Sequence, residues 1–391
     1  MIKMFPYSRQ KIDQADIQSV VKVMRSNFLT QGPIVEKFEK KLSKFTGSKY
    51  VSAVNSATSA LYLACRALGL TKGDIAWTTP NTFVSSANCI INCGAKVDFV
   101  DINKYDFNID LNILEKKLKN TKKNKLPKIV IPIHLGGYPY DQQRLFELSK
   151  KYNFNIVEDA SHAIGAKNNN QKVGNCKWSD ITVFSFHPVK IITTGEGGAI
   201  LTNNKFLNEK IKILRTHGIT RDIKYMKKKI KSHWYYEQID IGFNFRISDI
   251  HAALGLSQLK KINMFLKQRN QIANYYKKIL RNYPVSYQKI KKNSKSSYHL
   301  FIIKMIEKKN INHYNKIFSF LRSKGLGINL HYLPVHKQPF YNKLGYLKKK
   351  KFKESEEYAK SAISLPIYPG LDLKDLNYIL KNLKIALQKF R

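Results

Sequence analysis

The sequence predicts an α/β protein with a mainly parallel sheet flanked by helices, followed by a smaller C-terminal α+β domain. Up to about residue 216, short apolar runs typical of buried strands alternate with amphipathic stretches typical of helices. This alternation is characteristic of parallel strands that helices cover on both faces. The 391 residues also suit two domains better than one, and a hydrophobic content of 43% supports a packed interior.

The predicted elements of the larger domain follow one another without internal repeats. Two amphipathic helices come first, at residues 11–26 and 33–46, and Gly47 ends the second. The predicted strands are Tyr50–Val54, Ile75–Thr78, Ala95–Val100, Lys128–Ile133, Asn155–Val157, Ile181–Phe186 and Ala199–Thr202. The predicted helices between them are 57–69, 83–92, 110–119, 140–152 and 205–216.

A long, interrupted helical region is predicted at 247–282, and the pattern changes after it. The elements that follow are a strand at Ser297–Ile306, a helix at 311–323, a strand at Gly327–Tyr332 and a terminal helix at 373–388. A domain boundary therefore falls near residues 260–285. We divide the chain into a large domain, 1–265, and a small domain, 266–391.

No apolar run reaches the roughly eighteen residues that a membrane-spanning helix needs. The segment Met1–Lys11 also lacks the apolar core of a secretion signal, so we expect a cytoplasmic protein. The four cysteines (Cys65, Cys89, Cys93 and Cys176) do not make a disulfide framework and have no partners at metal-ligand spacing. We expect them to be packing residues and predict no metal site.

The net charge of +42 would by itself suggest nucleic acid or an anionic membrane as a partner. The basic residues are 58 Lys and only 11 Arg, however, whereas proteins that read nucleic acids rely on arginine for bidentate contacts. The Lys-rich runs also fall in predicted loops or on exposed helix faces. We therefore expect neither partner, and a basic surface that attracts a diphosphate-bearing substrate.

The segment Asn55–Ser59 joins the first predicted strand to the helix after it. In an open parallel sheet, ligands bind beyond the C-terminal ends of the strands. Small and hydroxyl residues at that place leave backbone N–H groups available at a helix N-terminus, which favours phosphate binding. An ordinary Ser/Thr helix cap is the alternative interpretation.

Two further segments follow later strands. Asp159 ends a predicted strand, where its carboxylate could pair with a protonated pyridine nitrogen; a simple turn-capping aspartate is the alternative.

Lys190 lies between the strand Ile181–Phe186 and the glycine-rich turn Gly195–Gly198. Burial there would lower the pKa of its amine, so that a neutral amine could form a Schiff base; an incidental lysine in a turn is the alternative.

Taken in chain order, these segments supply a phosphate grip, a partner for a pyridine nitrogen and a reactive lysine. Pyridoxal 5′-phosphate requires all three groups. We therefore expect this cofactor, with Lys190 as its attachment point and as the catalytic residue.

Seven ordered motifs resemble those of the DegT/StrS group of sugar aminotransferases, and the similarity runs from Tyr7 to about Pro366. The motifs are Leu29–Gly32, Asn55–Leu61, Thr79–Phe83, Glu158–His162, Ser185–Lys190, Gly195–Ala199 and Gly242–Arg246. The resemblance implies the fold of pyridoxal-phosphate-dependent transferases, also called the type I aminotransferase fold.

The resemblance also implies a role for each matching residue. Lys190 would carry the cofactor and act as the acid and base of the proton shift. Asp159 would pair with the pyridine nitrogen, Phe83 would stack on the ring, and His162 would lie near the ring hydroxyl. The phosphate would be held by Ala57, Thr58, Ser185 and, from a second subunit, Asn244. A homodimer with shared sites is therefore expected.

The sugar-nucleotide pocket, by the same resemblance, would be lined by Tyr7, Asn27, Phe28, Leu29, Thr30, His331, Tyr332, Leu333 and Pro334. Without the resemblance, Phe83 would be interpreted as a core residue, and His162 as a structural histidine. His331 would then be interpreted as a cap at a strand end.

Within the group, Ser185–Thr194 and His331–Pro334 are most similar to the enzymes of pseudaminic acid synthesis. This implies ping-pong transfer of an amino group from glutamate to the C4 keto group of a UDP-linked 4-keto-6-deoxy-N-acetylhexosamine. One alternative is a dTDP- or GDP-linked sugar, or amination at C3. Another is a pyridoxamine-dependent sugar dehydratase, in which a histidine replaces the lysine at position 190. The third is a non-enzymatic, basic nucleic-acid-binding protein.

Overall fold

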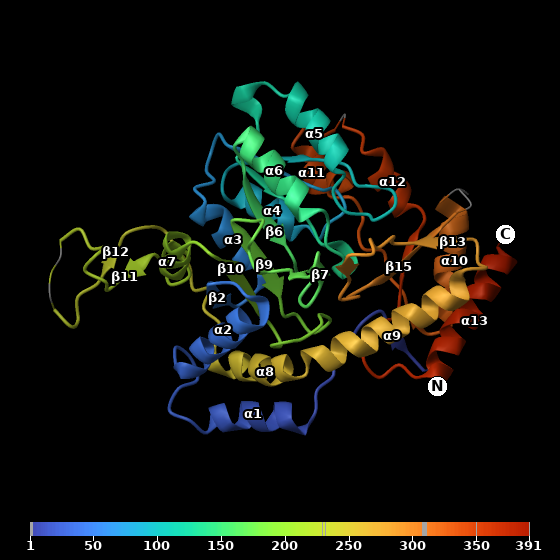
Figure 1. Cartoon of the computed structure of the whole chain (residues 1–391), viewed down its shortest axis with the longest axis horizontal. Coiled ribbons are helices and arrows are strands. Elements are labelled where there is room, and N and C mark those ends of the chain that lie inside the picture. Colours follow the sequence, from blue (N-terminus) through green and yellow to red (C-terminus); the bar gives the residue numbers. More distant parts are fainter. Residues whose placement is uncertain (1–2, 229, 231, 307–310, 349, 391) are drawn as a thin grey trace.

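The computed structural model describes residues 3–228, 230, 232–306, 311–348 and 350–390. A seven-stranded sheet with the order β2-β10-β9-β6-β5-β3-β4 lies at the centre of the molecule, surrounded by helices (Figure 1). Its strands are β2 (Tyr50–Val54), β3 (Ile75–Thr78), β4 (Lys96–Phe99), β5 (Ile129–Ile131), β6 (Asn155–Asp159), β9 (Ile181–Ser185) and β10 (Gly198–Thr202). All neighbours are parallel except β10, which is antiparallel to β2 and β9. The predicted α/β class is confirmed.

Consecutive residues of a strand point to opposite faces of the sheet, and the core follows this rule. On β9, Val183 belongs to the cluster that includes α3 and α7, whereas Phe184 belongs to the cluster that includes α2 and α8. The covering helices are α2 (Pro33–Thr46), α3 (Ala57–Ala67), α4 (Ser85–Asn92), α5 (Leu111–Asn120), α6 (Gln142–Tyr152), α7 (Lys205–Leu214) and α8 (Asp249–Lys260). Both faces of the sheet are therefore buried, which explains its continuous apolar strands.

The predicted helical region at 247–282 is interrupted at one residue. Helix α8 ends at Lys260 and α9 (Ile262–Leu280) begins two residues later. The side chain of Lys261, between them, contacts the carboxylates of Asp13 (2.7 Å) and Asp16 (2.6 Å) at the start of α1 (Gln14–Met24). Helix α1 is thereby tied to α8, which it packs against.

The C-terminal part forms a second core around an antiparallel sheet of β13 (Val285–Tyr287), β15 (Phe301–Met305) and β17 (Ala362–Leu365). Helices α10 (Ile311–Ser323) and α13 (Leu373–Lys389) pack on this core, whereas Tyr341 of α11 (Pro339–Lys343) and Tyr358 of α12 (Lys353–Ala359) belong to a core cluster of the large domain. Along α9, Phe265 belongs to a core cluster of the large domain and Ile272 to the second core. This change supports the proposed boundary after residue 265, which falls within α9.

The predicted strand at Gly327–Tyr332 is wrong. Only Leu326–Gly327 form a strand, β16, which pairs with β1 (Phe5–Pro6) near the N-terminus. Beyond it, Asn329, His331 and Tyr332 line a cavity instead of continuing the strand. Tertiary contacts around the cavity therefore override the local strand propensity of this segment.

The remaining elements are short. They are β7 (Lys167–Asn168), β8 (Gln171–Lys172), β11 (Ile219–Thr220), β12 (Glu237–Gln238), β14 (Ser294–Lys295) and the 3₁₀ turns Lys123–Lys125, Leu135–Gly137 and Val335–Lys337. The hairpin of β11 and β12 projects from the body as an arm, at the left of Figure 1. Trp234, near this hairpin, is 75% exposed.

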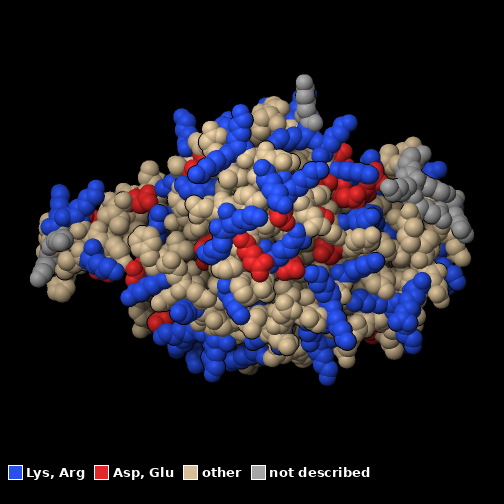
Figure 2. Space-filling model, turned by 45° about the horizontal axis from the view of Figure 1, so that its top comes forward, with Lys and Arg blue, Asp and Glu red and all other residues tan. Residues whose placement is uncertain are grey.

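The basic side chains are scattered over the visible face of the molecule rather than gathered in one stripe (Figure 2). A few small groups of acidic side chains lie between them. This distribution differs from the clustered footprint that nucleic-acid-binding surfaces show. No helix in the described ranges is long and apolar enough to cross a membrane.

Arg269 on α9 connects three distant segments in the interior. Its side chain is fully buried, and its Nη1 donates to the carbonyl oxygens of Tyr298 (3.2 Å), His299 (3.3 Å) and Ile367 (2.7 Å). Its Nη2 donates to the hydroxyl of Ser8 at 3.0 Å. Burial lowers the pKa of this guanidinium to about 9, and the neutral carbonyl and hydroxyl groups around it stabilise its charge.

Replacing Arg269 with Met should lower the free energy of unfolding by about 2–4 kcal/mol, because buried carbonyls lose their donor. Urea unfolding of the cofactor-free protein, followed by circular dichroism, measures the effect. Arg281→Met, at the exposed end of the same helix, is the control and should change stability by less than about 0.5 kcal/mol. Equal effects of the two substitutions would contradict the role of Arg269.

Candidate active site

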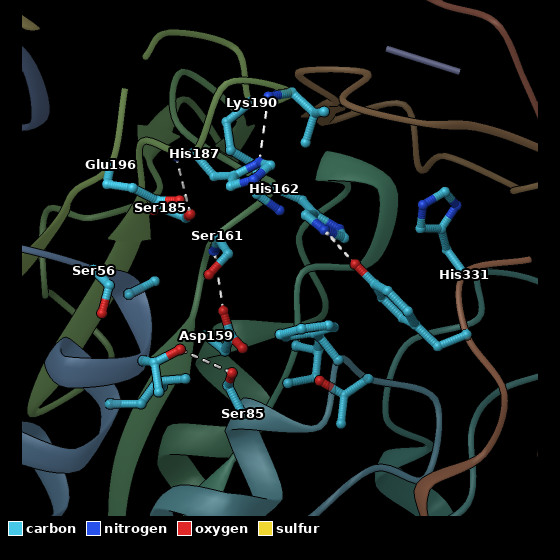
Figure 3. A pocket seen from close by; sticks show the side chains of 18 of the residues that line it. Ser56, Ser85, Asp159, Ser161, His162, Ser185, His187, Lys190, Glu196 and His331 are labelled. Atoms are coloured by element: carbon cyan, nitrogen blue, oxygen red, sulfur yellow. Dashed lines mark hydrogen bonds between the residues drawn. The ribbon is translucent and has the colours of Figure 1, made fainter. Parts of the chain in front are cut away.

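A cavity of about 430 Å³ lies where β6 and β9 end and α3 begins (Figure 3). This is the edge of the sheet at which ligands of open α/β folds bind. The C-terminal part of the chain contributes Asn329, His331 and Tyr332 to its wall, and the N-terminal segment contributes Tyr7. Both domains therefore build the same cavity.

Lys190 lies in the loop between β9 and β10, which backbone contacts hold at its base. The N–H of Phe186 donates to the carbonyl of Gly197 (2.9 Å), and its own carbonyl accepts from the N–H of Thr194 (3.0 Å). In addition, the hydroxyl of Ser8 donates to the carbonyl of Val189 at 2.8 Å. Because Ser8 is also bound by Arg269, the loop is tied to the junction between the domains.

Lys190 is half-buried, and it lines the cavity. Desolvation lowers its pKa to about 8, and the carboxylate of Asp159 acts against this shift. A substantial share of the amine is therefore neutral near pH 8, in contrast to an exposed lysine. A neutral amine can attack a carbonyl group or accept a proton.

Asp159 ends β6 and faces the same cavity, with both carboxylate oxygens engaged from the protein side. The N–H of Ser161 donates to Oδ1 at 3.1 Å, and the hydroxyl of Ser86 donates to Oδ2 at 2.6 Å. Each carboxylate oxygen can accept more than one hydrogen bond. Asp159 is therefore held in place while it can still accept from a donor in the cavity.

The first turn of α3 presents backbone N–H groups to the cavity. Ser56 caps the helix by accepting from the N–H of Ser59 (3.1 Å), and the N–H groups of Ala57 and Thr58 precede the first intrahelical bonds. Gly198 makes this packing possible, because an added Cβ would lie 2.7 Å from the nitrogen of Ala57. A helix N-terminus of this kind favours an anion such as phosphate.

His162 is fixed in one neutral tautomer. Its Nδ1 accepts from the N–H of Gly136 at 3.3 Å, and its Nε2 lies 3.0 Å from the hydroxyl of Tyr332. Burial, and then the charge of Lys190, hold the pKa of His162 well below its ordinary value. Since a backbone N–H can only donate, the ring proton lies on Nε2 and is donated to Tyr332. The hydroxyl proton of Tyr332 is then available to an acceptor in the cavity.

His331 is a second neutral histidine of the wall. Its Nδ1 lies 2.8 Å from the hydroxyl of Ser364, and its ring meets that of Tyr7 edge-on at 4.6 Å. Burial lowers the pKa of His331 to about 3, with the charge of Lys190 as the second cause. The imidazole is therefore an uncharged hydrogen-bonding group at ordinary pH.

The structure brings most of the predicted site residues together. Those that line the cavity are Lys190, Ala57, Thr58, Phe83, Asp159, His162, Ser185, Tyr7, His331 and Tyr332. Those placed outside its lining are Asn27, Phe28, Leu29, Thr30, Leu333, Pro334 and Asn244. Of the second group, all except Pro334 are exposed, so they remain available to a larger ligand or to another subunit.

Other lining residues received no role in the sequence analysis. They are Ser56, Leu61, Thr82, Ser85, Ile133, Ser161, His187, Val189, Glu196 and Asn329. Several of them lie within the motifs quoted above, so their closeness in sequence to predicted site residues could have identified them. Asn329 gave no such signal, because it lies in the segment predicted to be a strand. In the part of the chain that the structure describes, no group of three or more potential ligand side chains could hold a metal ion.

Comparison with known proteins agrees with this arrangement. The chain is 39% identical over 389 residues to UDP-4-amino-4,6-dideoxy-N-acetyl-β-L-altrosamine transaminase of Campylobacter jejuni subsp. jejuni serotype O:23/36 (strain 81-176), covering 99% of each chain. PseC of Helicobacter pylori, an aminotransferase involved in pseudoaminic acid biosynthesis, superposes with a TM-score of 0.90 at 32% identity, covering 99% of this chain and 100% of PseC.

Spr1654 of Streptococcus pneumoniae, in its PLP form, superposes with a TM-score of 0.89 at 28% identity, covering 100% of both chains. The model of the DegT/DnrJ/EryC1/StrS aminotransferase family matches residues 10–384. These findings confirm the resemblance drawn from the motifs. Because the match spans nearly the whole sequence and the relatives share its full length, this chain belongs to the DegT/DnrJ/EryC1/StrS aminotransferase family.

Proposed function

We propose that this aminotransferase uses pyridoxal phosphate to move an amino group from glutamate to the C4 keto group of a UDP-linked 4-keto-6-deoxy-N-acetylhexosamine. The observation that carries the proposal is the desolvated amine of Lys190, which shares one cavity with the carboxylate of Asp159. The proposed substrate is inferred from the relative of Campylobacter jejuni, whose name specifies a UDP-linked 4-amino sugar.

The residues of the cavity fit pyridoxal phosphate. The first turn of α3, with the hydroxyl of Ser185 beside it in the same cavity, provides donors for a phosphate. Asp159 provides an acceptor for a pyridinium N–H, and Lys190 provides an amine for the aldehyde. When bound, the cofactor supplies an electron sink that stabilises negative charge next to the transferred nitrogen.

Each side chain of the cavity would then have its own role in the reaction. Lys190 would carry the cofactor and afterwards move a proton at its Nζ, for which a pKa of about 8 is suitable near neutral pH. Asp159 would hold the ring nitrogen, and the neutral His162 and Tyr332 would orient acceptor oxygens without adding charge. Phe83, which is 57% exposed and lines the cavity, would cover one ring face.

A homodimer with shared sites is part of the proposal. Asn244 is exposed and lies outside the cavity of its own chain, although its backbone carbonyl accepts from Asn55 near the start of α3. Exposed apolar residues lie next to it in the sequence, namely Ile241 at 69% exposure and Phe243 at 46%. A second copy packed there would cover these side chains and bring Asn244 toward the other cavity.

The first prediction for the activity is spectroscopic. Purified protein supplied with pyridoxal phosphate should show the visible absorbance of a lysine-bound cofactor, and glutamate should bleach it. Among UDP-, dTDP- and GDP-linked keto sugars, the UDP-linked 4-keto-N-acetylhexosamine should restore the band fastest. Lys190→Ala should remain folded and lack the band. Normal colour and turnover in Lys190→Ala would disprove the assignment, and faster restoration by another sugar would correct the substrate.

Capture of pyridoxal phosphate by the cofactor-free protein should depend on pH. The reactive form of Lys190 is the neutral amine, and its share rises as the pH increases through a pKa of about 8. The rate of band formation should therefore rise by roughly tenfold from about pH 6.5 to about pH 7.5 and level off above about pH 9. Stopped-flow absorbance measures it. A rise that continues to about pH 10.5 would indicate a solvated lysine.

Mixed dimers test whether Asn244 acts across subunits. Asn244→Ala alone should weaken cofactor binding by about 10-fold, since a hydrogen bond to a charged group is lost. Dimers combining one Lys190→Ala subunit with one Asn244→Ala subunit should recover about half of the wild-type activity, because one site then has both residues. If Asn244 acts within its own chain, neither site is intact, and the mixed dimer should show no recovery.

A further inference from the structure

Ser86 contacts the carboxylate of Asp159 without lining the cavity. It is fully buried in the first turn of α4. Its hydroxyl oxygen lies 2.6 Å from Oδ2 of Asp159 and 3.4 Å from the carbonyl of Phe83. The shorter contact has the geometry of a charge-assisted hydrogen bond.

Thr82 extends this contact by one more hydroxyl group. Its Oγ1 lies 2.8 Å from the Oγ of Ser86, and either atom could donate. An ionised carboxylate can only accept, so the Ser86 proton is directed to Asp159. The proton between the two hydroxyls must then come from Thr82. The chain of donors therefore runs from Thr82 through Ser86 to Asp159 while Asp159 is ionised.

We propose that Ser86 is a positioning residue of the aminotransferase reaction, which holds and orients the carboxylate of Asp159, and that Thr82 supports it. The proposal rests on the proposed function, in which Asp159 partners a pyridinium nitrogen. Ser86 fixes Oδ2, and the N–H of Ser161 contacts Oδ1, so the plane of the carboxylate is set from both sides.

The consequence concerns the proton shared between Asp159 and the ring nitrogen. A well-oriented carboxylate would stabilise a proton on the ring nitrogen, and the cofactor would be a stronger electron sink when that nitrogen is charged. Without the Ser86 hydroxyl, the carboxylate would be less well oriented and would stabilise the positive charge of the ring less. Two measurable quantities should then change together: the affinity for the cofactor and the pH at which the visible band of the bound cofactor titrates.

The experiment compares cofactor-free wild type with Ser86→Ala. Pyridoxal phosphate is titrated into each protein, and binding is followed by the quenching of tryptophan fluorescence. Ser86→Ala should bind about 10- to 100-fold more weakly, the range for a lost hydrogen bond to a charged group. The midpoint of the visible band should move to higher pH, because a less positive ring releases the neighbouring proton less readily.

Ser52→Ala is the matched control, since it also removes a fully buried serine hydroxyl, one that contacts Asn208 (3.1 Å) away from the cavity. It should lower the melting temperature without changing affinity or midpoint. Thr82→Val should shift both quantities in the same direction as Ser86→Ala but less. Because Thr82 lines the cavity, Thr82→Ser, which keeps the hydroxyl, should behave like wild type.

The outcomes separate this proposal from the function on which it rests. If wild type takes up no cofactor, the proposed function fails. If wild type binds and Ser86→Ala binds within about 2-fold with an unchanged midpoint, the role of Ser86 is structural and the inference is overturned. If Ser86→Ala does not fold, Thr82→Val decides: a shifted midpoint supports the proposal, and a wild-type midpoint contradicts it.

Discussion

The site depends on keeping one lysine amine out of water and opposite a carboxylate. The chain has 58 lysines, and the one at position 190 is held in a cavity by a loop whose base is fixed through Phe186. Desolvation lowers the pKa of that amine, while the negative charge of Asp159 raises it and so limits the decrease. The sheet, the first turn of α3 and the wall supplied by the C-terminal domain matter to function because they maintain this environment.

The two domains are joined at the same place. Arg269 reaches carbonyls of the C-terminal domain and the hydroxyl of Ser8, and Ser8 in turn donates to Val189 beside the lysine. Movement of one domain relative to the other would therefore disturb the lysine loop directly. A buried cation held by neutral carbonyl and hydroxyl groups tolerates little displacement, because each lost contact leaves charge unsolvated. The junction thus adds rigidity where the chemistry needs it.

The sequence predicted those features that local pattern and chain order determine. The helix at 33–46 and the strand at Ile75–Thr78 agree residue for residue with α2 and β3, because amphipathic period and strand length are local properties. The strand predicted at Gly327–Tyr332 was wrong, since the cavity determines that segment's path. Ser86 was not identified either, because its importance arises from a contact with a residue 73 positions away. Such a contact cannot be detected from hydrophobic periodicity or from the spacing of motifs in the sequence.

Burial in the cavity has different effects on the protonation of neighbouring side chains. Burial moves the pKa of Lys190 toward the physiological range, whereas it moves those of His162 and His331 away from it. The histidines are therefore uncharged groups with fixed hydrogen bonds, and in the proposed mechanism the lysine would be the group that changes its charge during turnover. A second ionisable group beside it would compete for the same proton. Neutral histidines would thus leave Nζ of Lys190 as the atom that gives and takes the proton in transamination.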